Sequence, residues 1–151
     1  MFVGTFEHSL DDKGRLILPS TFRDAFATGA FLTQSIDGCL SLMDQTVFAE
    51  TAREQQRLAK AGKEARHRFR VFAAGSTQVA PDKQGRIPVS ATQKAFAAIE
   101  KGCVVNGAIT HLEIWSAERW AELEAAGSAA LIEGDDTDLH LRLLLGEDPT
   151  S

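Results

Sequence analysis

The chain contains one short turn sequence twice, and this internal repeat constrains the fold more than any other feature. Residues 10–19 read LDDKGRLILP and residues 81–90 read PDKQGRIPVS, so Asp, Gly and Arg recur 71 positions apart. A second match, with an offset of 72, aligns MDQTVFAE at 43–50 with WSAERWAE at 115–122. A repeat that preserves both a turn and a later helix start indicates two copies of one structural unit.

These matches divide the chain into four parts. Repeat 1 is predicted to span residues 1–52 and repeat 2 residues 76–123. Residues 53–75 are predicted to form a basic helical linker between them, and residues 124–151 an acidic C-terminal tail. In the tail we expect little regular structure beyond one or two helical turns near Leu139–Leu145.

Each repeat is predicted to contain four short strands and two helices. The expected strands cover 2–9, 15–19, 30–36, 39–43, 76–80, 86–90, 102–109 and 111–115, and the expected helices cover 20–28, 44–61, 61–75, 90–99 and 116–126. One such unit leaves strand edges unpaired and has little core, whereas two copies can pair each other's edges. We therefore predict an α+β fold, with two interlocked repeats forming a β-barrel about a pseudo-twofold axis and with flanking helices.

Local signals support these elements. Asp37-Gly38 between two apolar runs is typical of a hairpin turn. Asp44 and Ser116 have side-chain oxygens that can cap the helices that follow them. Trp115 and Trp120 flank the second of these caps at the spacing of a hydrophobic staple, which predicts core positions rather than base stacking.

The repeated turn itself is the candidate functional feature. An acid followed three residues later by glycine favours a type I turn with a glycine bulge, because glycine tolerates a positive φ. Arg15 and Arg86 then lie near the tips, within reach of Asp11 and Asp82. A single turn of this kind is commonly structural. A surface Asp–Arg ion pair, however, contributes only about 0–1 kcal/mol to stability, so stability is a weak reason for the chain to contain the pair twice. Two guanidinium groups on stiff hairpins are better explained as ligands for phosphate or guanine.

The charge distribution agrees with an anionic ligand although the net charge is −5. Residues 113–151 hold ten acids and two arginines, whereas residues 53–70 hold seven basic residues and two acids. Phosphate binding responds to the local electrostatic field rather than to the average. The sequence therefore has a basic middle and an acidic end.

Other chemistry finds little support. The four histidines and two cysteines lack metal-ligand spacing, and no phosphate-binding loop or nucleophile elbow occurs, so we expect no metal, no cofactor and no catalysis. An acid–base enzyme using Asp11 and Asp82 is disfavoured, since solvated acids keep ordinary pKa values. Cys39 and Cys103 are expected to be reduced, buried thiols. With no secretory signal and no membrane span, we expect a cytoplasmic protein.

The stretches MFVGTFEHSLDDKGRLILPSTFR and PDKQGRIPVSATQKAF, each containing Asp-x-x-x-Arg, resemble the MraZ family of bacterial transcriptional regulators, which are built from two SpoVT/AbrB-like domains. The resemblance covers nearly the whole chain. It implies a fold of the double-split barrel type and a DNA-binding site at Asp11 with Arg15 and at Asp82 with Arg86. Lys83 stands one position earlier in its turn than Lys13, so the two lysines are not expected to make equal DNA contacts.

The resemblance also implies partners. Proteins similar to this one form ring-like homo-oligomers and bind short direct repeats in double-stranded DNA, upstream of the division and cell-wall operon that begins with their own gene. This implies a nucleoid-associated regulator, most simply a repressor, with no membrane and no small-molecule substrate. The alternative from another class is a barrel that mainly binds a protein partner, as an antitoxin-like or scaffold module.

Overall fold

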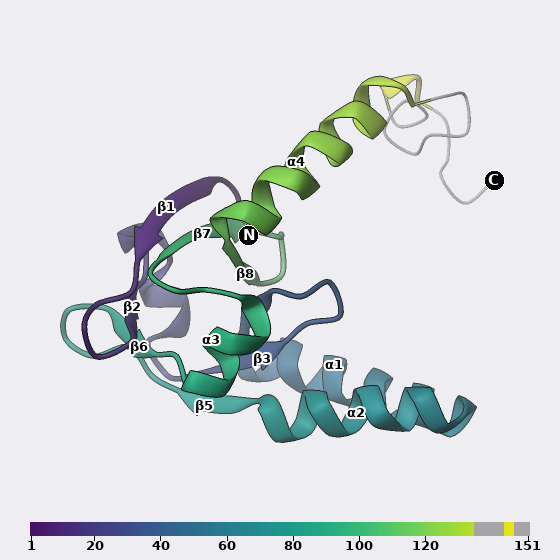
Figure 1. Ribbon diagram of the computed structural model, residues 1–151, viewed down its shortest axis with the longest axis horizontal. Helices are drawn as coiled ribbons and strands as arrows, with labels where there is room; N and C mark the ends of the chain where they lie inside the picture. The colour runs from purple at the N-terminus through teal and green to yellow at the C-terminus, as the bar shows by residue number, and fades with distance from the viewer. Residues whose placement is uncertain (135–143, 147–151) are drawn as a thin grey trace. The chain divides into compact units, whose positions relative to one another are not determined.

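The computed structural model describes residues 1–134 and 144–146. The chain divides into two compact units, Met1–Ala117 and Glu118–Ser151. Figure 1 shows the first unit as a small β structure that carries two helices in a hairpin, α1 and α2. Both copies of the repeated turn belong to this first unit.

Repeat 1 contains four strands, two short 3-10 turns and one helix. In chain order they are β1 (Thr5–Ser9), β2 (Arg15–Ile17), η1 (Ser20–Phe22), η2 (Asp24–Phe26), β3 (Ala30–Gln34), β4 (Leu40–Met43) and α1 (Gln45–Leu58). The expected helix over 20–28 is instead the pair of 3-10 turns, because Pro19 at its start offers no side-chain cap. Asp44 caps α1 as predicted, since its carboxylate accepts a hydrogen bond of 2.9 Å from the backbone N–H of Val47.

The remaining chain repeats this order. It contains η3 (Ala59–Ala61), α2 (Lys63–Gly75), β5 (Thr77–Val79), β6 (Arg86–Pro88), α3 (Ala91–Ala97), β7 (Gly102–Gly107), β8 (Leu112–Ser116) and α4 (Ala117–Ile132). The helix expected to end at residue 126 continues to Ile132, because Ala129, Ala130 and Leu131 after the weaker Gly127 and Ser128 have high helix propensity. The turns expected near Leu139–Leu145 lie largely outside the described residues.

The strands interlock across the two repeats. A six-stranded antiparallel sheet has the order β1-β7-β8-β4-β3-β5, and β2 pairs with β6 in a separate ribbon. Exchanging the repeats leaves this order unchanged, which is the signature of a pseudo-twofold axis. The axis passes where equivalent residues face each other, at Leu16 with Ile87 and at Ser41 with Glu113. These pairs are separated by the 71 and 72 positions of the sequence repeat.

The predicted α+β fold of two interlocked repeats is therefore confirmed, with one qualification of its geometry. The six-stranded sheet is open rather than closed into a continuous barrel, with β1 and β5 at its edges. Strand β5 has only three residues, and β2 and β6 pair with each other instead of extending the large sheet. A single bridge between Leu10 and Leu16 joins the ribbon to the chain of β1.

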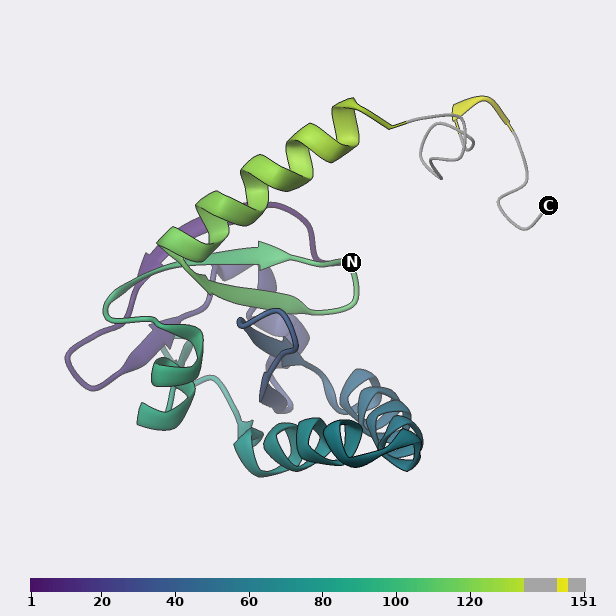
Figure 2. The same cartoon turned by 45° about the vertical axis from the view of Figure 1, so that its right-hand side comes forward.

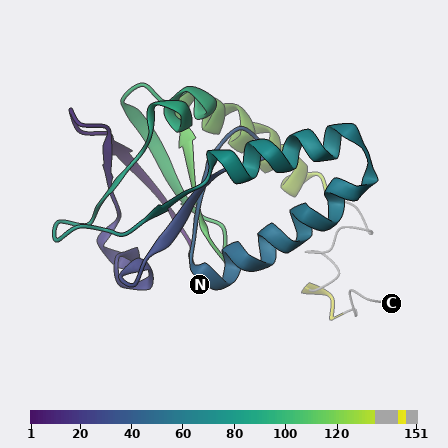
Figure 3. The same cartoon turned by 90° about the horizontal axis from the view of Figure 1, so that it is seen from below.

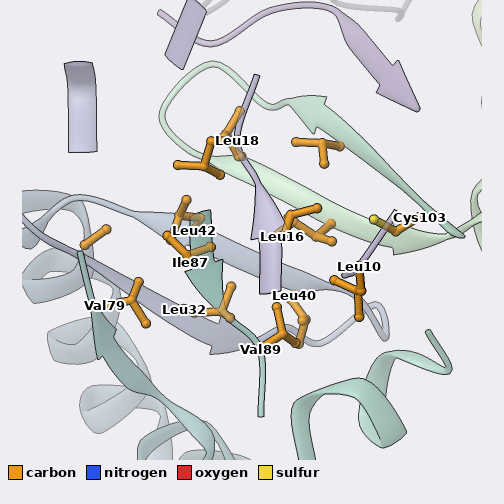
Figure 4. Close-up of a cluster of buried hydrophobic side chains, with 14 of the residues drawn as sticks. Leu10, Leu16, Leu18, Leu32, Leu40, Leu42, Val79, Ile87, Val89 and Cys103 are labelled. Carbon is orange, nitrogen blue, oxygen red and sulfur yellow. The ribbon is translucent and has the colours of Figure 1, made fainter. Parts of the chain in front are cut away.

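The core of the first unit lies between the ribbon and the large sheet. Figure 4 shows Leu16 and Ile87 from the ribbon among Leu32, Leu40 and Leu42 from β3 and β4. All five side chains are fully buried. The ribbon that carries the repeated turns is thus anchored by apolar residues of both repeats, and burial of each such side chain contributes about 1.5–3 kcal/mol.

Cys39 and Cys103 are free, buried thiols, as predicted. Burial raises the pKa of Cys39 to about 12 and that of Cys103 to about 11, so both stay protonated near neutral pH. Trp115 is also buried, as predicted, and Trp120 is half-buried. Among the described residues, no helix combines the length and the apolar composition that a bilayer crossing requires.

The basic linker contributes to both helices of a helical hairpin: its residues 53–58 complete α1, and its residues 63–75 form α2. Phe48 of α1 stacks on Phe31 of β3 and on Phe72 of α2, with ring centroids 4.0 and 5.8 Å apart. Figures 2 and 3 show this hairpin on the side of the first unit that faces away from the repeated turns. Its basic residues therefore do not adjoin Arg15 and Arg86.

Candidate nucleic-acid interface

The first copy of the turn, residues 11–15 (turn 1), is organised by one carboxylate. Asp11 Oδ1 accepts hydrogen bonds of 2.9 Å from the backbone N–H groups of Lys13 and Arg15. Asp11 Oδ2 accepts a bond of 2.8 Å from Arg15 Nε. The Gly14 N–H donates to the Asp11 carbonyl at 2.9 Å, and Gly14 has a φ of 74°, a conformation that favours glycine. One aspartate therefore sets both the backbone bend and the direction of the arginine.

The second copy, residues 82–86 (turn 2), has the same bonds. Asp82 Oδ1 accepts from the N–H groups of Gln84 and Arg86 at 2.9 Å, and Oδ2 accepts from Arg86 Nε at 2.7 Å. The Gly85 N–H donates to the Asp82 carbonyl at 2.9 Å, and Gly85 has a φ of 79°. The repeat in sequence is thus a repeat in atomic geometry.

Each aspartate uses only one N–H of its arginine. The bond is to Nε, and within the described part of the chain no acceptor contacts the terminal amino groups of either guanidinium. The two arginine side chains are 28 % and 25 % exposed, so part of each remains open to solvent. A guanidinium held by its Nε edge keeps the terminal amino groups for a planar ligand such as a phosphate or a guanine edge.

Asp11 and Asp82 have pKa values below the ordinary values that we expected, which makes both groups still less suited to proton transfer near neutral pH. The backbone N–H of Arg15, followed by its side chain, lowers the pKa of Asp11. The corresponding groups of Arg86 lower the pKa of Asp82. Both carboxylates are therefore ionised at neutral pH and act as fixed acceptors, which gives no support to a general acid or base at the turns.

The β2–β6 ribbon places the two turns on one surface. The Leu18 N–H donates to the Gly85 carbonyl at 2.8 Å, and the Val89 N–H donates to the Gly14 carbonyl at 3.0 Å, so each turn is bonded to the end of the other repeat's strand. Because side chains alternate along a strand, buried Leu16 lies between residues that face outward. Arg15 faces Pro88 and Ile17 faces Arg86 in the ladder.

Arg15 and Arg86 are therefore diagonal neighbours on the outer face of the ribbon, where Cα atoms are typically about 7–8 Å apart. Figure 3 shows turn 1 in purple and turn 2 in teal at the same end of the first unit. The structure thus brings together the two predicted arginines, each with its predicted aspartate.

Arg23 is a further cation at this surface that the sequence did not single out. Its Nε donates to the Leu18 carbonyl at 3.1 Å. The guanidinium lies over turn 2, since a Cβ placed on Gly85 would clash with Arg23 Nε. Gly14 has no such cover: a Cβ there would meet only the Val89 carbonyl, at 3.5 Å. The only signal in the sequence is an arginine eight residues after Arg15, which no local pattern relates to turn 2.

Lys13 and Lys83 are both exposed and differ in their place within the turns. The backbone N–H of Lys13 donates to Asp11, whereas Gln84 occupies that position in turn 2. With Arg23, the ribbon surface carries five cations against Asp11, Asp12 and Asp82. Among residues 1–134 and 144–146, no group of three His, Cys, Asp or Glu side chains is placed to hold a metal ion.

Fold and site together define an α+β protein of two interlocked repeats, each of which presents an aspartate-anchored arginine on a shared ribbon. Comparison with protein families agrees with this architecture. The family model "MraZ protein, putative antitoxin-like" matches residues 1–70 and 72–142, nearly one segment per repeat. The chain belongs to the MraZ family.

Curated relatives support the same assignment. The chain is 44 % identical over 124 residues to "Transcriptional regulator MraZ" of Mycobacterium ulcerans (strain Agy99) and to the protein of that name in Mycobacterium avium (strain 104), covering 82 % of this chain and 87 % of each relative. It is 45 % identical over 120 residues to "Transcriptional regulator MraZ" of Mycobacterium tuberculosis (strain CDC 1551 / Oshkosh), covering 80 % of this chain and 84 % of that protein.

Proposed function

We propose that this protein is a sequence-specific DNA-binding transcriptional regulator whose DNA contacts come from Arg15 and Arg86. The observation that carries the proposal is the pair of turns with the same hydrogen bonds, each fixing an arginine by Nε on one outward surface. The names of the curated relatives support the regulatory role.

The β2–β6 ribbon is a kind of structure that a DNA groove accepts. The major groove of B-DNA admits a two-stranded β-ribbon, and arginine reads guanine through O6 and N7 with its planar fork. Anchoring by Asp11 and Asp82 removes side-chain freedom before binding, which lowers the entropic cost of each contact. Lys13 and Lys83, which flank the arginines, add phosphate contacts that position the ribbon without reading sequence.

Assembly makes such weak contacts sufficient. A ring-like homo-oligomer presents the same ribbon at regular intervals, so contacts by successive subunits add through effective concentration. A cyclic arrangement matches direct repeats in DNA in the way that a twofold dimer matches a palindrome. We propose that the targets are direct repeats upstream of the protein's own division and cell-wall operon, and that binding represses transcription.

The matching family is described as antitoxin-like, which favours a second candidate function. In this alternative, the first unit mainly binds a protein partner. The two functions differ in their dependence on salt. Binding of arginines to DNA phosphates releases condensed counterions from the DNA. The DNA affinity of such a protein therefore falls steeply as the salt concentration rises. A protein-binding module shows no such dependence toward DNA.

A gel-shift titration tests the proposal. The full chain is titrated against the DNA directly upstream of its gene, alongside Arg15→Ala and the control Arg57→Ala, whose side chain pairs with Glu54 on α1 away from the ribbon. Wild type and Arg57→Ala should bind with similar affinity and with a steep salt dependence. Arg15→Ala should lose at least about tenfold in affinity, within the 1–3 kcal/mol expected for one arginine contact, at unchanged melting temperature. Equal affinity of Arg15→Ala and wild type, or absence of salt-dependent binding, would refute it.

A further inference from the structure

Helix α4 is exposed over most of its length. Residues 121–132 are all exposed, and residues 125–132 contain no charged side chain. Apart from the helix's own backbone, no atom of the described residues lies within 4 Å of a Cβ placed on Gly127. A helix of 16 residues with glycine and serine in its interior is marginally stable in water without packing. Helix α4 therefore needs a partner surface.

The apolar residues of α4 form a stripe along one side. Leu123, Gly127 and Leu131 recur every four residues, so they share one side of the helix. The two leucines are 44 % and 63 % exposed. At 3.6 residues per turn, Glu124 borders this stripe and Ala129 lies on the opposite side of the helix. An exposed apolar stripe on a helix is typical of a surface that binds another protein.

A groove on the first unit has a matching apolar surface. It has a volume of about 380 Å³ and opens between α2 and the turn that joins β3 to β4, beside the α1–α2 hairpin of Figure 3. Its lining includes Met43 and Phe72, which are buried. Ile36 and Val71, which also line it, are 79 % and 50 % exposed. A hydrophobic groove of this kind accepts the apolar side of an amphipathic helix.

The charges of the two surfaces are complementary. Residues 53–70, from α1 through α2, hold seven basic residues against two acids. Arg68 lines the groove, and no ion pair joins it to an acid among the described residues. Helix α4 holds three acids against one arginine. Pairing of two α4 helices would bring like charges together, whereas α4 against the hairpin brings opposite charges together, which favours the hairpin as its partner.

We propose that α4 of one copy of this chain docks in the groove beside α2 of a second copy. The apolar stripe of α4 lies against the apolar lining of the groove, with Glu124 beside Arg68. Because the two surfaces differ, every docked pair retains one unoccupied groove and one undocked helix, and repetition of such a heterologous contact builds a ring if it closes. The proposal rests on the assembly in the proposed function and not on the DNA contacts.

Sedimentation velocity of the full chain tests the proposal. Wild type should form oligomers larger than a dimer. Leu131→Glu on the stripe and Val71→Glu at the groove should each weaken association at least about tenfold, a loss of about 1.4 kcal/mol. Ala129→Glu on the opposite side of α4, and Ala73→Glu on α2 outside the groove lining, are the matched controls and should assemble like wild type. All four positions are exposed, and thermal melting checks that each variant is folded.

A mixture of the two disrupted variants gives the sharpest result. Leu131→Glu retains an intact groove and Val71→Glu retains an intact α4, so an equimolar mixture contains one complete interface. At a concentration where each variant alone is monomeric, the mixture should form a 1:1 dimer and nothing larger. Self-association of Val71→Glu like that of wild type would indicate pairing of α4 with α4, and a mixture that stays monomeric would show that the two surfaces do not bind each other.

Either of those results would overturn the proposal. A wild-type chain that is monomeric but still binds the upstream DNA would also overturn it, together with the ring, and would leave the DNA contacts standing. Conversely, normal assembly of Arg15→Ala without DNA binding would separate the two surfaces and support the proposal.

Discussion

Turn 1 and turn 2 are alike in their hydrogen bonds and differ in what surrounds them. In both, one aspartate accepts two backbone N–H groups and one arginine Nε, at distances that agree within 0.1 Å. Gly85 is buried beneath Arg23, whereas Gly14 is half-buried. The comparison shows that Asp-x-x-Gly-Arg contains the information for its own geometry. The neighbouring residues then decide how firmly each turn is supported.

The segments that follow the two turns differ more. Ser90 and Gln93 form a capping box at the start of α3, with reciprocal hydrogen bonds of 3.1 Å. Gln93 also donates to the Leu32 and Gly75 carbonyls, which fixes α3 to the sheet. Pro19 at the same place in repeat 1 has no capping side chain, and only 3-10 turns form. Equivalent turns therefore tolerate quite different structure immediately after them.

The largest expected effect tests whether the turns are equivalent in function. Arg86→Ala should lose DNA affinity to the same extent as Arg15→Ala, at least about tenfold each, because each removes one arginine contact worth about 1–3 kcal/mol. The double variant should show no specific binding. Fluorescence anisotropy with the upstream DNA measures both, and thermal melting provides the control for folding. If only one arginine matters, the functional equivalence of the turns is wrong.

A smaller effect on stability should separate the turns. Alanine at Gly14 or Gly85 is forced to a φ near 75–80°, which costs about 1–2 kcal/mol in either turn. Gly85→Ala must also displace Arg23 from its bond to Leu18, a further loss of about 0.5–1.5 kcal/mol. Urea unfolding measures the difference. In an Arg23→Ala background the excess at Gly85 should vanish, and an excess that persists there would contradict this explanation.

The lysines should differ in their contribution to the salt dependence. Lys13→Ala leaves turn 1 with Asp11 and Asp12 against Arg15, whereas Lys83→Ala leaves turn 2 with one acid and one base. DNA affinity should therefore fall more for Lys13→Ala than for Lys83→Ala. A variant that loses a phosphate contact should also show a slope of log affinity against log salt that is smaller in magnitude by about 1. Binding isotherms over a salt series measure both. Identical slopes and affinities would mean that the lysines act alike.

The smallest effect is on acid stability. The pKa of Asp82 is lowered in the folded chain, so ionised Asp82 stabilises the fold. This stabilisation is fully present above the unfolded pKa of about 3.9 and is lost as the pH falls from there through the folded pKa. Asp82→Asn should therefore lose less melting temperature than wild type between about pH 5 and pH 3. Asp11→Asn should behave alike, because Asp11 has the same partners. Asp12→Asn is the control, and an identical response of all three variants would contradict this assignment.

Much of the fold was predictable because its signals are local or repeated. The Asp37-Gly38 hairpin, the Asp44 cap and both turns follow from a few adjacent residues. The pairing of the two repeats followed from the sequence offset, which reappears as Leu16 opposite Ile87. The sequence did not predict that the six-stranded sheet is open, because closure of a sheet depends on the lengths of its strands and on which strand edges pair.

The sequence predicted the two arginines at the centre of the candidate site, Arg15 and Arg86, but not Arg23 beside them. Arg15 and Arg86 share a turn pattern with their aspartates, so sequence alone locates them. The packing of Arg23 over Gly85 joins residues far apart in the chain and needs the interlocked fold. The basic stretch at 53–70 counted toward DNA binding in the sequence, yet it lies on the helical hairpin away from the turns.

The most direct test of the account replaces anchored guanidinium groups by bare charges. The double variant Arg15→Lys/Arg86→Lys keeps the charge but loses the Nε bond to each aspartate and the planar fork. Its affinity for the upstream DNA and for random DNA of equal length is measured by anisotropy at one salt concentration. The account predicts that specific affinity falls at least about tenfold while affinity for random DNA is retained. Wild-type specific affinity in the double-lysine variant would show that charge alone suffices and would contradict the account.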